Sequence, residues 1–350
     1  MILVGLEAEL GASKRGTDKG VRRLREALST THGDVIKGMQ TITQERCVLY
    51  KEFRYAKNFE DYYLFCKENL IPCMKEVFEK KEFPLILSSE HANMFGIFQA
   101  FRSVHKDKKI GILYLDAHAD IHTAYDSDSK HIHGMPLGMV LNRVRSGFNR
   151  MSESEEKAWQ KLCSLGLEKG ALEIDPKCLV YFGVRSTEKS ERDVIKELQI
   201  PLFSVGAIRE NMQEVVQKTK ELLKAVDIIY LSLDLDIMDG KLFTSTGVRE
   251  NNGLSFDELK QLLGLLLEGF KDRLGAVEVT EYNPTVSAKH NNEEEKQVLE
   301  ILDLIINSCK FKDKKPSFAM SYRSFFKQND KKLENETNNG QCLDEKLTRF

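Results

Sequence analysis

The chain reads IGILYLDAHAD from Ile110 to Asp120. Its first six residues are apolar and rich in branched side chains, which is typical of a buried β-strand. Asp116, His118 and Asp120 follow at a spacing of two, so an extended chain places all three on one face. Buried carboxylates are costly unless a cation compensates their charge. The stretch therefore predicts a buried strand that ends in a metal site.

A second acidic strand end lies far downstream. The apolar run Ile228–Leu233 leads into Asp234 and Asp236. On their own, these two carboxylates could also serve as helix caps. Open α/β sheets, however, form their sites at the carboxyl ends of the strands. We therefore interpret both acidic ends as parts of one metal site.

Strand-like segments alternate with helical patterns along most of the chain. The segments with strand character are Ile2–Leu6, Pro84–Ser88, Lys109–Asp116, Cys178–Gly183, Pro201–Ser204, Asp227–Asp236 and Ala276–Tyr282. Apolar residues recur at helical spacing from Ile208 to Val226, and Ser255 with Glu258 has the pattern of a capping box. Asn292 with Glu295 is expected to open a further helix. This alternation predicts a parallel sheet that is covered by helices on both faces.

Two segments depart from this pattern. Residues 151–167 begin acidic and then become apolar around Trp159, the one tryptophan of the chain, which predicts an inserted amphipathic helix. The C-terminal residues are rich in Lys, Asn and Glu and have little to bury. We expect a catalytic domain over residues 1–310 and a C-terminal extension over 311–350, which is disordered from about residue 327.

Composition narrows the choice of partners and compartment. Lys and Arg number 52 and Asp and Glu 54, so charge gives no reason to expect nucleic acid or an anionic membrane as a partner. No stretch approaches the ~20 apolar residues of a membrane span, and the N-terminus lacks the apolar run of a signal peptide. The seven cysteines form no C-x-x-C pair, so we expect reduced thiols and a cytoplasmic protein.

The candidate metal ligands comprise four carboxylates and two imidazoles, namely His91, Asp116, His118, Asp120, Asp234 and Asp236. One divalent ion would leave negative charge uncompensated, whereas two would balance the four carboxylates. Two ions about 3.5–4 Å apart can activate a shared water. Oxygen-rich ligands with some imidazole suit Mn²⁺, with Co²⁺ as the alternative, and the absence of cysteine ligands argues against structural zinc.

Two further residues have the chemistry of a hydrolase site. His133 follows the first acidic strand end, and a neutral imidazole near an activated water is a natural proton carrier. Glu281 ends the last strand-like segment and could hold a planar cation through paired hydrogen bonds. An ordinary solvated glutamate is the alternative for Glu281.

At this point the sequence resembles the ureohydrolase family, and within it the arginases of bacterial type. The resemblance covers about residues 2–308 and is carried by Asp116-Ala-His-Ala-Asp120, His133-Gly134, Ser232-Leu-Asp234-Leu-Asp236, Thr246-Gly247 and Glu281-Tyr-Asn-Pro284. It implies the arginase fold, a single three-layer α/β/α domain with a parallel sheet of about eight strands.

The resemblance also implies a role for each site residue. One metal would be held by His91, Asp116, Asp120 and Asp234, and the other by His118, Asp116, Asp234 and Asp236. His133 would shuttle protons, Asp120 would also accept one, and Glu281 would bind the guanidinium group. The remaining positions implied in substrate binding are Ser129 and His131 at the α-carboxylate, His122 in the same loop and Glu188 near the α-amino group.

The implied reaction is hydrolysis of L-arginine to L-ornithine and urea by a metal-bridging hydroxide, and a homo-oligomer is left open. The rivals within the family are agmatinase and formimidoylglutamase, and the rival of another class is a metal-stabilised binding or scaffold protein. The main departure is Ser88-Ser89-Glu90-His91-Ala92, where the family has Gly-Gly-Asp-His-Ser. The longer Glu90 leaves the orientation of His91 open.

Overall fold

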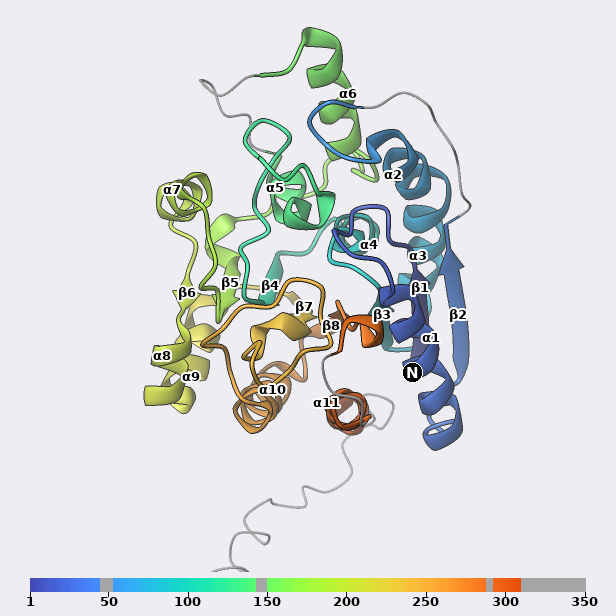
Figure 1. The fold of residues 1–350 in the computed structure, drawn as a ribbon, viewed down its shortest axis with the longest axis vertical. Helices are drawn as coiled ribbons and strands as arrows, with labels where there is room; N and C mark the ends of the chain where they lie inside the picture. The colour runs from blue at the N-terminus through green and yellow to red at the C-terminus, as the bar shows by residue number, and fades with distance from the viewer. Residues whose placement is uncertain (45–52, 143–149, 288–291, 310–350) are drawn as a thin grey trace, which may run out of the picture. The chain divides into compact units, whose positions relative to one another are not determined.

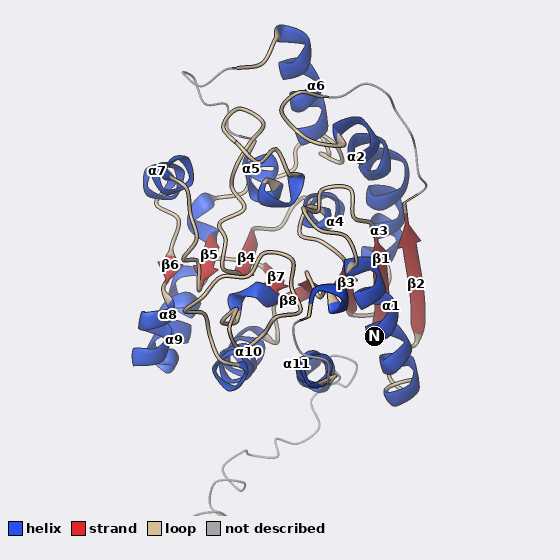
Figure 2. Cartoon of the chain, in the orientation of Figure 1, coloured by secondary structure: helices blue, strands red, loops and turns tan. Residues whose placement is uncertain are grey.

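The computed structural model describes residues 1–44, 53–142, 150–287 and 292–309. Within these ranges, eight strands form one sheet in the order β2-β1-β3-β8-β7-β4-β5-β6, and every pairing is parallel. The strands are β1 (Ile2–Glu7), β2 (Gly38–Thr43), β3 (Pro84–Ser88), β4 (Ile110–Leu115), β5 (Leu179–Phe182), β6 (Leu202–Phe203), β7 (Ile228–Asp234) and β8 (Leu274–Thr280). Figure 1 and Figure 2 show this sheet between two layers of helices.

One helical layer lies on each face of the sheet. The first is built from α2 (Phe59–Phe65), α3 (Ile71–Phe78), α4 (Asn93–Val104), α5 (Pro136–Leu141), α6 (Glu153–Cys163) and α7 (Lys189–Leu198). The second is built from α1 (Thr17–Thr31), α8 (Val205–Glu210), α9 (Met212–Leu222), α10 (Phe256–Phe270) and α11 (Glu293–Cys309). The predicted α/β class and three-layer arrangement are confirmed.

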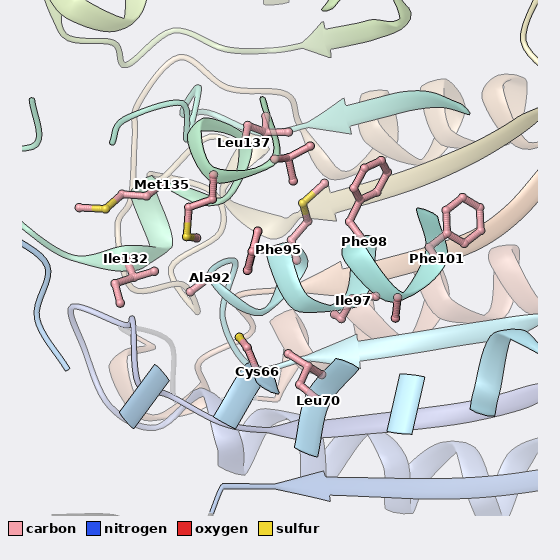
Figure 3. Packing of buried hydrophobic residues seen from close by; sticks show 14 of the residues in the cluster. Cys66, Leu70, Ala92, Phe95, Ile97, Phe98, Phe101, Ile132, Met135 and Leu137 are labelled. Carbon is pink, nitrogen blue, oxygen red and sulfur yellow. The ribbon is translucent and has the colours of Figure 1, made fainter. Parts of the chain in front are cut away.

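Burial on both faces explains why the central strands are apolar throughout. In β4, Ile112 and Tyr114 belong to the core beneath α4, whereas Leu113 and Leu115 belong to the core beneath α10. Helix α4 is itself buried on nearly all sides, and Figure 3 shows its aromatic residues packed between neighbouring elements. Each such side chain contributes roughly 1.5–3 kcal/mol when it leaves water. This packing fixes the strand ends in place.

The structure differs from the sequence-based prediction in two elements. Strand β2 was missed because its residues, GMQTIT, are mostly polar and it lies at the edge of the sheet with most side chains partly or fully exposed. The single helix expected from Ile208 to Val226 is two helices, α8 and α9, which meet at Asn211. The side chain of Asn211 accepts a hydrogen bond from the backbone N–H of Glu214 and so begins a new helix.

The other helix signals agree with the structure. Ser255 and Glu258 form the expected capping box at the start of α10. Helix α11 begins one residue after Asn292. The segment 151–167 contains α6, which has a capping box of its own between Ser152 and Glu155 and buries Trp159 almost completely.

One prediction concerns residues that the structure does not describe. The C-terminal extension over residues 311–350, with its expected disorder, lies outside the described residues. Among the helices of the described ranges, none is both long and apolar enough to cross a membrane.

Candidate metal centre and active site

The candidate ligands lie at the carboxyl ends of neighbouring central strands. Strands β3, β8, β7 and β4 are adjacent in the sheet, as Figure 2 shows. His91 follows β3, Asp116 follows β4 directly, Asp234 ends β7, and Glu281 follows β8. Sequence order does not reveal this neighbourhood, because β3 and β4 are separated in the sheet by the last two strands.

Two groups of ligand atoms meet at this edge. His91 Nδ1 lies 2.9 Å from Asp116 Oδ2, 3.1 Å from Asp120 Oδ2 and 3.2 Å from Asp234 Oδ2. His118 Nδ1 lies 2.9 Å from Asp236 Oδ2 and 3.6 Å from Asp116 Oδ1. Two sets of atoms are thus close enough to hold a metal ion, one with His91 and one with His118, and Asp116 belongs to both.

The electrostatics of this cluster fit divalent cations. Asp116, Asp234 and Asp236 are buried, and Asp116 Oδ2 accepts no hydrogen bond among the described residues. Burial, with the nearby charges of Asp236 and Asp120, raises the pKa of Asp116 to about 7. The pKa of Asp234 is also raised well above its ordinary value, chiefly by burial. Two divalent ions would relieve this repulsion, so the residues present fit a binuclear metal centre.

The ring of His91 is oriented from behind by a buried chain of polar groups. Its Nε2 lies 2.9 Å from Ser232 Oγ, which in turn donates to Glu278 Oε2 at 3.2 Å. Tyr230 donates to the same carboxylate at 2.7 Å. This arrangement leaves Nδ1 of His91 facing the aspartates.

Glu90, the departure from the family pattern, does not orient His91 through its carboxylate. Glu90 Oε1 instead accepts a hydrogen bond from the backbone N–H of Gly11 at 2.7 Å. The longer side chain therefore ties the N-terminal loop to the end of β3. The His91 ring is instead contacted by Ser232 and by the stacked ring of Tyr114.

Two site residues have a backbone conformation that is uncommon for side chains other than glycine. Asp120 has φ 48° and Glu281 has φ 66°. Such conformations are maintained only where surrounding contacts enforce them, and they gather at functional sites. For Glu281 one such contact is the hydrogen bond that its Oε1 accepts from the backbone N–H of His91 at 3.0 Å.

His133 lies on a short 3-10 turn, Ile132–Gly134, beside Glu281. Its Nδ1 is 3.6 Å from Glu281 Oε1. Burial lowers the pKa of His133, but the interaction with the nearby Glu281 carboxylate outweighs burial, so the net shift of the pKa is upward.

A cavity of about 380 Å³ opens above the metal cluster. Besides His133, Glu281 and four of the candidate ligands, its lining contains all four further residues expected around the substrate, Ser129, His131, His122 and Glu188. Sequence reasoning missed Glu191, which also lines the cavity and whose Oε2 lies 3.5 Å from His122 Nε2. Its position three residues after Glu188, at the start of α7, is a capping-box pattern that could have indicated it. Glu250, whose Oε1 lies 3.6 Å from His118 Nε2, was missed as well.

The fold and the two ligand groups define a binuclear metal-dependent hydrolase with a three-layer α/β/α architecture. The sequence pattern of the Arginase family matches residues 1–301. The chain belongs to this family.

Individual relatives agree with this assignment. The crystal structure of Helicobacter pylori arginase is 92% identical, with a TM-score of 0.80, over 89% of this chain and 100% of that one. Bacillus subtilis arginase is 29% identical over 310 residues, which cover 87% of this chain and 96% of the relative. Entamoeba histolytica arginase, solved in complex with L-ornithine, has a TM-score of 0.73 at 22% identity over 87% of this chain and 97% of its own, and supports the fold.

Proposed function

We propose that this protein hydrolyses L-arginine to L-ornithine and urea. The observation that carries the proposal is the pair of His–Asp ligand groups that share Asp116 beneath a cavity lined by Glu281 and His133. Membership of the Arginase family and the 92% identity to Helicobacter pylori arginase support the same activity.

The two groups of ligand atoms support a ligand assignment. His91, Asp116, Asp120 and Asp234 would hold one ion, and His118, Asp116 and Asp236 the other. Asp234 would also reach the second ion, as the family resemblance implies. Mn²⁺ is the proposed metal and Co²⁺ the alternative, because the ligand atoms are mostly carboxylate oxygens with one imidazole on each side. When bound, the two ions would lower the pKa of a water molecule and make it a nucleophile toward the guanidinium carbon.

The substrate would lie along the cavity with its guanidinium group at the metal end. Glu281 offers a buried carboxylate that can pair with two guanidinium N–H groups. At the other end, Ser129, His131 and His122 are proposed to surround the α-carboxylate, and Glu188 the α-amino group. Fixing both ends of the molecule would place its reacting carbon in a defined position.

Proton movements would fall to Asp120 and His133. Asp120 Oδ2 lies at the metal cluster and accepts a hydrogen bond from the Tyr114 hydroxyl at 3.0 Å, so it is held in place to accept a proton from the attacking water. His133, which the nearby Glu281 keeps toward its protonated form, is proposed to protonate the departing amine of ornithine.

A comparison of two substrates tests this function. Protein reconstituted with Mn²⁺ or Co²⁺ is assayed for urea release from L-arginine and from agmatine, which lacks the α-carboxylate. We expect efficient release from L-arginine and little from agmatine. A preference for agmatine would assign the chain to another branch of the family, and no release from either would contradict arginine hydrolysis.

We also propose that the protein is cytoplasmic. The cysteines Cys66, Cys73, Cys163, Cys178 and Cys309 are free thiols, which supports the cytoplasm as the compartment. A homo-oligomer is left to a measurement of mass in solution.

A further inference from the structure

Lys57 lies beside the substrate cavity although it belongs to none of the family motifs. It precedes α2, and its Nζ lies 2.8 Å from Nε2 of His131, a residue 74 positions away that lines the cavity. Its side chain is otherwise exposed. The contact brings an ammonium group to the loop proposed to receive the α-carboxylate.

The backbone around Lys57 holds it in this place. The N–H of Lys57 donates to the carbonyl of Lys130 at 2.8 Å, directly beside His131. The side chain of Asn58 donates to the carbonyl of Leu10 at 2.7 Å. The segment before α2 is thereby fastened to both the His131 loop and the N-terminal loop.

His131 does not itself bring a positive charge to this end of the cavity. An ammonium group can only donate, so Nε2 of His131 accepts from Lys57 and carries no proton. Burial lowers the pKa of His131, and the charges of Lys57 and His133 lower it further. His131 is thus a neutral ring that fixes the position of the Lys57 ammonium.

The described lining of the cavity is rich in carboxylates. Of its lining residues within the described ranges, seven are Asp or Glu and none is Lys or Arg, and three of the seven, Asp120, Asp234 and Asp236, are proposed metal ligands. The four glutamates outside the metal ligand set attract the guanidinium and ammonium groups of an amino acid but repel its carboxylate. The ammonium group of Lys57 contacts His131 in the substrate loop. The bond to His131 takes one of its three N–H groups, so the other two can donate to a carboxylate.

We propose that Lys57 supplies the positive charge that recognises the α-carboxylate of the substrate, with His131 as the residue that positions it. The inference rests on the proposed function, since it takes L-arginine as the substrate. Lys57 would then determine specificity for free amino acids over analogues whose α-carboxylate is an amide or is absent.

Kinetics of the Lys57→Ala, Lys57→Arg and Lys130→Ala variants test this role. L-Argininamide retains the guanidinium and α-amino groups but has no carboxylate charge, so its inhibition constant serves as the reference. For Lys57→Ala we expect KM for L-arginine to rise about tenfold, kcat to stay near the wild-type value, and the inhibition constant of argininamide to stay unchanged. Lys57→Arg should restore most of the affinity. Lys130→Ala, which removes the neighbouring charge of the same loop, should behave like the wild type.

Several results would overturn the inference. Equal weakening of L-arginine and argininamide would show that Lys57 only supports the loop, and no change in either would show that it has no role. A loss of affinity in Lys130→Ala but not in Lys57→Ala would assign the charge to Lys130. Wild-type protein that fails to hydrolyse L-arginine would instead contradict the proposed function on which the inference rests.

Discussion

Asp116 is the residue on which both metal positions depend. Its two carboxylate oxygens face different histidines, Oδ2 toward His91 and Oδ1 toward His118. Asp116→Asn should therefore abolish arginine hydrolysis and reduce the content of both metals, because an amide cannot supply two anionic oxygens. Elemental analysis of purified protein measures this, with the exposed Asp193→Asn on α7 as the control. Retention of two equivalents of metal in Asp116→Asn would contradict a shared ligand.

His133 should behave differently, because it contacts Glu281 and belongs to neither ligand group. His133→Ala is expected to retain its metal while kcat falls roughly 10²-fold or more, as for the loss of a general acid. Parallel measurement of metal content and urea release separates these effects. Loss of one metal equivalent in His133→Ala would show that the residue is a ligand rather than a proton donor.

The site could be anticipated where its residues share a motif and not where they meet only in space. Asp116, His118 and Asp120 follow one strand at a spacing of two, so strand geometry alone groups them. Lys57 and His131 approach one another from segments with no common pattern. Glu90 illustrates a third case, since its departure from the family pattern was visible in the sequence but its partner, Gly11, lies 79 residues away.

Helix α6 belongs to the inserted segment 151–167 and not to the family motifs. Trp159 is buried and stacks on Phe59 with ring centroids 6.4 Å apart. On the same helix, Glu156 accepts a hydrogen bond from the Tyr125 hydroxyl at 3.0 Å, and Tyr125 lies between His122 and Ser129 in the loop that lines the cavity. Helix α6 thus contacts the loop that lines the cavity at Tyr125.

Trp159→Ala should destabilise the protein by about 3–5 kcal/mol, the usual cost of truncating a buried aromatic side chain. Urea unfolding followed by circular dichroism measures the change, and Lys157→Ala, at an exposed position of α6, is the control. A blue-shifted fluorescence maximum of the wild type should report the buried indole, because Trp159 is the one tryptophan. Deletion of residues 153–165 with unchanged melting temperature and arginine kinetics would show that α6 is dispensable.

The boundaries of helices and strands could be predicted where the sequence carries a local signal. The capping box of Ser255 and Glu258 marked the start of α10 correctly, because both halves of the motif are local. Strand β2 gave no such signal, since its stability comes from pairing with β1 rather than from an apolar pattern. The break at Asn211 was missed because apolar spacing continues across it while the side chain caps the second helix.

At the scale of the whole domain, the order of the strands creates the site. The apolar runs predicted a parallel sheet, but they carry no information about which strands are neighbours. The chain inserts β8 and β7 between β3 and β4, and this crossover brings His91, Asp116, Asp234 and Glu281 to one edge. The assembly of the cluster is therefore a property of topology, which local sequence cannot specify.

The central claim is that this edge holds two metal ions that act together in arginine hydrolysis. Titration of apoprotein with Mn²⁺ or Co²⁺ in a calorimeter, with urea release from L-arginine measured on the same samples, tests it most directly. Four clustered carboxylates predict saturation near two equivalents per chain and full activity only when both are bound. Saturation at one equivalent with full activity would contradict the binuclear account.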